Sequence, residues 1–246
     1  MTKLELQSII EKYHLDGLVE NVKWVINKDK TLSIDFMSPS REMIGNVIAF
    51  DFPLPESSIG ISNTTQLDKL LSITNDNLTL DYLKEGKIIA KLLIADSQFN
   101  LNYSLADLLT VPKPGAYNGP EEYEVEAELN NEIITALIKA KNALPDCENV
   151  VVELVNDLSN GLQLEFTFNG DVEYANKITY CISNIQAFTS KGFKLKYNSE
   201  LIKQVLVCNK KAESSILSLN SNGLMKLEFK HNDALQSKYY IVAKSE

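Results

Sequence analysis

The feature that most constrains the fold of this chain is an internal repeat whose period is about half the sequence. Each half begins with an amphipathic helix, continues as strands, returns to a helix and ends in further strands. In the first half, the opening helix has an apolar face made by Leu6, Ile9, Ile10 and Tyr13. The stretches LSIDF (32–36) and LQLEF (162–166) occupy equivalent places in the two halves. The sequence therefore predicts two related domains.

Most of the predicted strands alternate apolar and polar residues, which is typical of a sheet with one buried face. Helices then cover the buried face of the sheet from one side. The pattern predicts an α+β fold made of two duplicated domains, each with a β-sheet and two helices on one face. We expect three of the helices to begin at Thr65, Asn131 and Ser199, with a polar side chain at each start acting as the cap.

A segment rich in proline and glycine divides the two halves. Residues 106–123 contain three prolines and two glycines, which excludes regular structure. We therefore expect a first domain over 1–105, a connecting linker over 106–123 and a second domain over 124–246. The linker begins with the apolar residues Leu108, Leu109 and Val111, which either pack back on the first domain or bind a partner.

The composition and the missing motifs exclude several classes of protein. The chain has 246 residues and a net charge of −9, which argues against a basic coat for nucleic acid. It has neither an apolar run long enough to span a bilayer nor the pattern of a signal peptide, so we expect a cytoplasmic protein, in the host cytoplasm if it is viral. Nucleotide-binding, metalloprotease and hydrolase motifs are missing. We expect no catalytic residues, no cofactor and no metal site.

The lysines of the predicted helices lie mostly on the faces opposite the apolar residues. At 100° per residue, this holds for Lys12, Lys69, Lys139, Lys203 and Lys210, with Lys211 nearby, whereas Lys141 falls on the apolar side. In an isolated protein such a face is simply solvated. If the helices of several units faced one another, the lysines would line a common surface suited to phosphates.

At this point the sequence resembles a known family, the DNA polymerase sliding clamps, which include PCNA and the clamps of T4-like phages. The resemblance rests on LDKLLSITNDNLTLDYLKEGKIIAKLLIAD (67–96), on the helix NNEIITALIKA (130–140), on the proline-rich linker and on the ending LMKLEFKHNDALQSKYYIVAKSE (224–246). It covers essentially the whole chain and is closest to the phage clamps.

The resemblance implies a homotrimeric ring, without enzymatic activity, that encircles double-stranded DNA and tethers the replicative DNA polymerase. The helices would line the hole and contact DNA independently of sequence. The residues that this role assigns to DNA are Lys12, Lys69, Lys139, Lys203, Lys210 and Lys211. Subunits would join through edge strands, with Phe99, Leu101 and Tyr103 on one edge and Ile178, Tyr180 and Ile182 on the other.

The resemblance also implies a pocket that binds short peptides of the polymerase and the clamp loader. By position it would use Met43, Ile44, Leu108, Leu109, Val111, Tyr240, Ile241 and Val242. Neighbouring side chains of a strand point to opposite faces, so we expect Tyr239 in the core and Tyr240 in the pocket. A shift of one residue in the register would exchange them.

Two alternatives stay open on the sequence alone. The first is a β-rich structural or assembly protein with a duplicated fold and no DNA role, which the acidity of the chain favours. The second is an enzyme whose carboxylates are scattered along the sequence and converge only in the folded chain.

Overall fold

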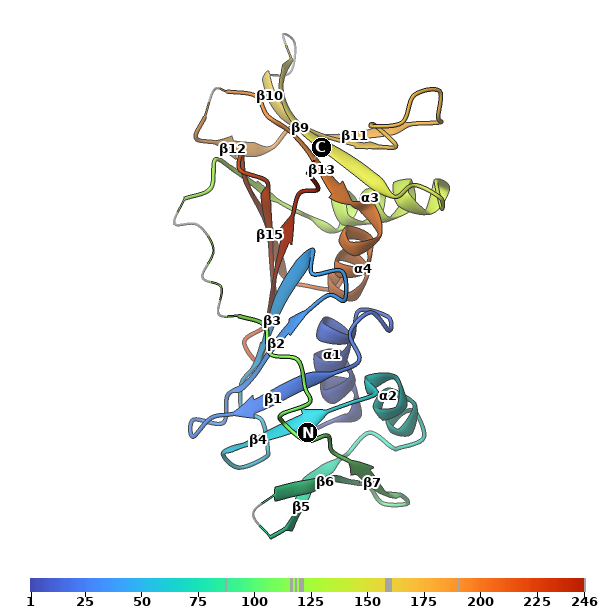
Figure 1. The fold of residues 1–246 in the computed structure, drawn as a ribbon, viewed down its shortest axis with the longest axis vertical. Helices are drawn as coiled ribbons and strands as arrows, with labels where there is room; N and C mark the ends of the chain where they lie inside the picture. Colours follow the sequence, from blue (N-terminus) through green and yellow to red (C-terminus); the bar gives the residue numbers. More distant parts are fainter. Residues whose placement is uncertain are drawn as a thin grey trace. The chain divides into compact units, whose positions relative to one another are not determined.

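A computed structural model of the chain describes residues 1–86, 88–115, 117, 119, 122–157, 161–189 and 191–245. It divides into two compact units, the first made of Met1–Ala116 with Asn232–Ser237 and the second of Tyr117–His231 with Lys238–Glu246. Figure 1 shows the course of the chain through both. The part of the predicted linker at residues 116, 118, 120 and 121 lies outside the described residues.

The first unit contains two helices and seven strands in its described part. The helices are α1 (Lys3–His14) and α2 (Thr64–Ser72). The strands are β1 (Val22–Ile26), β2 (Leu32–Met37), β3 (Met43–Ala49), β4 (Ser57–Ile61), β5 (Thr79–Glu85), β6 (Ile88–Ala95) and β7 (Asn100–Ser104). They form one sheet in the order β3-β2-β1-β4 and a second in the order β5-β6-β7.

The described part of the second unit also holds two helices, with nine strands. The helices are α3 (Asn131–Ala143) and α4 (Ser199–Asn209). The strands are β8 (Val125–Glu128), β9 (Asn149–Asp157), β10 (Gly161–Phe168), β11 (Ile178–Ile182), β12 (Ile185–Ala187), β13 (Lys194–Asn198), β14 (Ser214–Asn220), β15 (Leu224–Asn232) and β16 (Leu235–Val242). Their orders are β11-β10-β9-β13 and β12-β8-β14-β15-β16.

The strand orders confirm the duplicated α+β fold that the sequence predicts. In the first unit β1 pairs with both β2 and β4, and in the second unit β9 pairs with both β10 and β13. The order β5-β6-β7 corresponds to β14-β15-β16, and the second unit extends this sheet with β8 and β12. LSIDF lies in β2 and LQLEF in β10, which are equivalent strands.

Alternating burial within the strands builds the two cores. In β1 every second residue is buried, and Trp24 lies edge-on to Phe52 with ring centroids 5.7 Å apart. Tyr13 of α1 packs edge-on to the same Trp24, so the helix is fixed to the sheet through an aromatic cluster. In the second unit Phe229 of β15 and Tyr239 of β16 also pack edge-on, with centroids 5.9 Å apart.

Asparagine side chains cap three of the four helices. Asn63, Asn130 and Asn198 accept hydrogen bonds from backbone N–H groups in the first turns of α2, α3 and α4. Helices α3 and α4 begin at Asn131 and Ser199, as the sequence predicts, and α2 begins one residue before Thr65. The capping residues that the sequence predicts, Thr65, Asn131 and Ser199, lie one or two positions after the observed caps. In each case an asparagine precedes the expected cap, and its amide oxygen reaches the free N–H groups from outside the helix.

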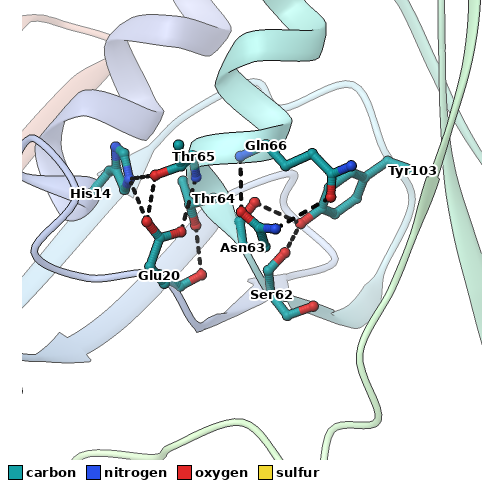
Figure 2. A network of polar contacts seen from close by, with 8 residues as sticks. All are labelled: His14, Glu20, Ser62, Asn63, Thr64, Thr65, Gln66 and Tyr103. Carbon is teal, nitrogen blue, oxygen red and sulfur yellow. Dashed lines mark hydrogen bonds and ion pairs between the residues drawn. The ribbon is translucent and has the colours of Figure 1, made fainter.

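A network of polar contacts joins both helices of the first unit (Figure 2). Glu20 accepts hydrogen bonds from the backbone N–H and the hydroxyl of Thr65, at the start of α2. His14, at the end of α1, lies 3.4 Å from the Glu20 carboxylate and 3.0 Å from the Thr65 hydroxyl. Partial burial raises the pKa of Glu20, but the hydrogen bonds from Thr65 and His14 outweigh this effect and hold the pKa below its ordinary value.

This geometry predicts that Glu20→Gln destabilises the chain by about 1 kcal/mol at neutral pH, a typical value for a hydrogen bond to a partly exposed charged group. Because the folded pKa of Glu20 is depressed, its contribution is complete above a pH of about 4.5 and is lost as the pH falls through the lower, folded value. Urea unfolding of both proteins at neutral and acidic pH measures this difference. A difference that does not shrink in acid would contradict the prediction.

Candidate nucleic-acid interface and partner surfaces

Four of the predicted DNA-facing lysines lie exposed on or beside the helices. Lys69 belongs to α2 and Lys139 to α3, whereas Lys210 and Lys211 directly follow α4. Within the described residues, none of the four has an ion pair with a carboxylate. These ammonium groups are therefore available to an anionic partner.

The outward placement of Lys12 is wrong. The residue is only 3% exposed, and its Nζ lies 3.7 Å from the carboxylate of Glu11. Lys12 follows Ile9 by three positions, so it lies beside the apolar stripe of α1, and its long stem packs there. Lys141, which the sequence places on an apolar face, is indeed buried and donates to the carbonyl of Pro145 at 2.7 Å.

Lys203 is half-buried and paired. Its Nζ donates to Glu200 Oε1 at 3.1 Å, within the first two turns of α4. Partial burial raises the pKa of Glu200, but the hydrogen bond from Lys203 and the nearby ammonium groups hold it below its ordinary value. Lys203 therefore differs from the four exposed lysines, because a carboxylate of its own helix already neutralises it.

The strands predicted to join subunits both lie at sheet edges. β7 pairs with β6 alone in its sheet, and β11 pairs with β10 alone. The backbone groups on the outer side of such a strand are open to a further strand. Phe99, Leu101, Ile178 and Tyr180 keep exposed surface at these edges, although Phe99 precedes β7 instead of belonging to it.

The other two residues predicted for the subunit interface face the interior of their own units. Ile182 is buried at the end of β11. Tyr103 is buried, and its hydroxyl donates to the carbonyl groups of Ser62 and Asn63, directly before α2 (Figure 2). Burial raises the pKa of Tyr103 to about 12. The assignment of both residues to a contact surface is therefore corrected, and Tyr103 instead fixes β7 to the start of α2.

The pocket residues predicted in the first unit separate into two groups. Leu108 and Leu109 are exposed in a turn closed by the hydrogen bond from Thr110 N–H to Asp107 O, and Leu109 is 93% exposed. Ile44 is half-buried on β3. Met43 and Val111 are buried, so their assignment to a surface pocket is corrected. For the start of the linker, Val111 packs inward whereas Leu108 and Leu109 do not.

The C-terminal strand of the second unit has the predicted orientation. Tyr239 is fully buried and Tyr240 is half-buried on the opposite face, with Val242 exposed beyond it. The register that places Tyr239 in the core is therefore confirmed. Ile241 shares the buried face with Tyr239, so its assignment to a surface pocket is corrected.

A groove of about 290 Å³ lies next to this strand, within the second unit. It is lined by Tyr117, Asn220, Asn222, Gly223, Leu224, Val242 and Ala243. The ring of Tyr117 packs edge-on to that of Tyr240, with centroids 5.0 Å apart. Tyr117 and Leu224 were missed by the sequence reasoning, although an exposed aromatic residue in a proline-rich linker is itself a signal for a binding surface.

Charged residues surround Tyr240 on the same face. Glu228 forms ion pairs with Lys226 and Lys238, each with an N–O distance of 2.6 Å. Partial burial raises the pKa of Glu228, but the hydrogen bonds from both lysines outweigh it and keep the pKa below its ordinary value. Lys226 Nζ also lies 4.5 Å from the centroid of the Tyr123 ring. These charged side chains therefore hold one another in place on the face that carries Tyr240.

Two further properties follow from the described residues. They contain no group of three or more histidine, cysteine, aspartate or glutamate side chains arranged to hold a metal ion. Within the same residues, every helix is too short or too polar to cross a bilayer.

Comparison with known proteins now identifies the fold. No protein-family model matches the chain, and no curated protein matches it in sequence. Among solved structures, it is similar to the crystal structure of proliferating cellular nuclear antigen from Entamoeba histolytica, with a TM-score of 0.76. The match covers 99% of this chain and 96% of that chain at 16% identity. The two duplicated α+β units therefore have the PCNA-like clamp fold.

Proposed function

We propose that this protein is a sliding clamp, a closed ring of three copies that encircles double-stranded DNA and tethers the replicative DNA polymerase without catalysing a reaction. One observation carries the proposal: in a PCNA-like fold, the helices present lysines without an ion pair in the described part of the chain, while β7 and β11 leave their outer edges open. The relation to the clamps of T4-like phages and the location in the cytoplasm belong to the same proposal.

The exposed lysines suit a partner that is bound without recognition of its base sequence. A lysine attracts a phosphate in any sequence, because the phosphate backbone carries no base information. Such contacts are weak and sensitive to salt, so a ring that makes a few of them can move along the duplex. The net charge of −9 then acts against DNA binding elsewhere on the protein.

The open edges suit the assembly of identical copies. A strand pair between β7 of one copy and β11 of the next would satisfy the free backbone groups of both edges. The exposed parts of Phe99, Leu101, Ile178 and Tyr180 would add apolar contact.

Light scattering should therefore give a mass three times the 27.6 kDa of one chain. Tyr180→Glu places a charge on the β11 edge and should shift the protein to monomers, because the charge would be desolvated in the contact. Tyr174→Glu is the matched control, since Tyr174 is fully exposed in the loop before β11. A wild-type protein that stays monomeric at micromolar concentration, or equal effects of both variants, would contradict the proposed contact.

Replacing lysines beside the helices should weaken DNA binding. For Lys139→Gln with Lys210→Gln, we expect the slope of log affinity against log salt to fall by about 0.9 for each phosphate that the protein no longer neutralises. The control is Lys28→Gln with Lys113→Gln, which removes the same charge from exposed positions outside the helices. Fluorescence anisotropy with a duplex fragment measures both pairs. Equal reductions in the two pairs would show that only the net charge matters.

The groove beside the C-terminal strand is the proposed docking site for short peptides of the polymerase and the clamp loader. Its lining includes Tyr117, Leu224 and Val242, and the ring of Tyr240 packs edge-on to that of Tyr117 beside it. A few such anchors supply most of the binding energy in peptide recognition. The exposed Leu108 and Leu109 are proposed to contribute to the same partner surface.

Tyr240→Ala should weaken the binding of a peptide from the cognate polymerase by roughly tenfold or more, as expected for an aromatic anchor. The trimer should remain, because Tyr240 lies on neither open edge. Calorimetry measures the affinity, and Tyr174→Ala serves as the control for an exposed tyrosine outside the groove. Unchanged peptide affinity in Tyr240→Ala would refute the docking site.

The acidity of the chain supports one other candidate, a structural or assembly protein with this fold and no DNA role. A direct test separates the two. The protein is threaded onto a linear duplex that is anchored at one end, and the free end is then blocked. A clamp should stay on the blocked duplex in high salt and leave the open one. An assembly protein should leave both alike.

A further inference from the structure

The carboxylate of Glu200 lies between the two helices of the second unit and is shared by two lysines. Its Oε1 accepts hydrogen bonds from Lys203 Nζ at 3.1 Å and from Gln204 Nε2 at 2.9 Å. Its Oε2 lies 3.4 Å from Nζ of Lys141, which belongs to α3. A single acidic side chain in the first turn of α4 therefore neutralises lysines from both α3 and α4.

The two lysines differ in how much of their side chain is exposed and could contact a further anion. The side chain of Lys141 is 5% exposed, and its Nζ also donates to Pro145 O, so it is part of the packing between α3 and α4. The side chain of Lys203 keeps 25% of its surface exposed. Lys203 can thus exchange one anion for another without leaving the surface, whereas Lys141 is fixed.

Lys203 also lies in line with an unpaired lysine. Residues seven positions apart in a helix lie on one face, about 10.5 Å apart along the axis. Lys210 follows Lys203 by seven positions, and its backbone still has helical angles at the end of α4. If Lys203 were released, α4 would present two ammonium groups on the face where it now presents one.

We infer that Glu200 limits the affinity of the protein for DNA, because its ion pair with Lys203 keeps that ammonium group from the phosphates. The inference rests on the proposed function, and it adds a residue that regulates the strength of the DNA contact. A tether that must slide gains from having few contacts at once, since each further phosphate contact tightens binding and has to be broken at every step.

The test compares a glutamate that is paired with lysines, Glu200, with one that is not, Glu132. Glu200→Gln removes the charge, whereas its amide still occupies the same space. Glu132→Gln removes the same charge from the first turn of α3, where Glu132 is exposed and has no ion pair within the described residues. Each variant is titrated with a duplex DNA fragment at several salt concentrations, with anisotropy as the readout.

We expect Glu200→Gln to bind roughly threefold to tenfold more tightly than the wild type at about 50 mM salt, with a salt dependence steeper by about 0.9. Glu132→Gln should show a smaller gain and an unchanged slope. The gain of Glu200→Gln should disappear when Lys203→Gln is added. Glu200→Asp keeps the charge but shortens the side chain by one methylene, and it should also tighten binding because the carboxylate no longer reaches Lys203.

Equal effects of Glu200→Gln and Glu132→Gln, or a gain that survives Lys203→Gln, would overturn the inference and leave the proposed function intact. A wild type and variants that all fail to bind duplex DNA would overturn both. If Glu200→Gln unfolds, as thermal melting would show, the affinity of Glu200→Asp for DNA is the deciding measurement, since this variant keeps the negative charge on α4.

Discussion

The structure depends on the burial of one face of each helix against strands of its own unit. The aromatic contact between Tyr13 and Trp24 shows how closely α1 is held. A helix that buries one stripe in this way leaves its opposite face to the solvent, whatever residues that face carries. The exposed lysines of α2 and α3 therefore have little effect on the stability of the fold and are available to bind a partner. The same burial explains why Lys12 and Lys141, at the borders of the buried stripes, belong to the packing.

Whether each remaining lysine can bind an anionic partner depends on the carboxylates next to it, not on the number of lysines in the chain. Lys139 and Lys210 have no carboxylate partner in the described part of the chain, whereas Lys203 is held by Glu200. On the sheet face of the second unit, Glu228 holds Lys226 and Lys238 in the same manner. An acidic chain can thus keep a few cations on its helices available and neutralise others, which the net charge alone does not reveal.

Much of the fold could be predicted from the sequence, because period and alternation are local signals. The duplication and the α+β class follow from them, whereas the choice of Tyr239 over Tyr240 for the core came from the resemblance to sliding clamps. The site could be predicted only in part. The alternation of apolar and polar residues in a strand shows which residues share a face, but it does not show which face is covered by the rest of the protein. Met43, Ile241 and Tyr103 are apolar or aromatic residues whose buried face became clear only with the strands in place. The contact between Tyr117 and Tyr240 joins residues far apart in sequence, and no local pattern encodes it.

The two edge strands proposed to join subunits, β7 and β11, belong to sheets that are not equivalent in the duplication. β7 ends the sheet that corresponds to β14-β15-β16, whereas β11 ends the one that corresponds to β3-β2-β1-β4. In the proposed ring each contact joins unlike edges, so it is heterologous and is repeated by rotation around the ring. Each added copy offers a new free edge, and growth stops only when the rotation per copy brings the last edge back to the first. In the proposed assembly, the angle between neighbouring copies would therefore set the number of subunits, and a small change in that angle would give an open spiral in place of a closed ring.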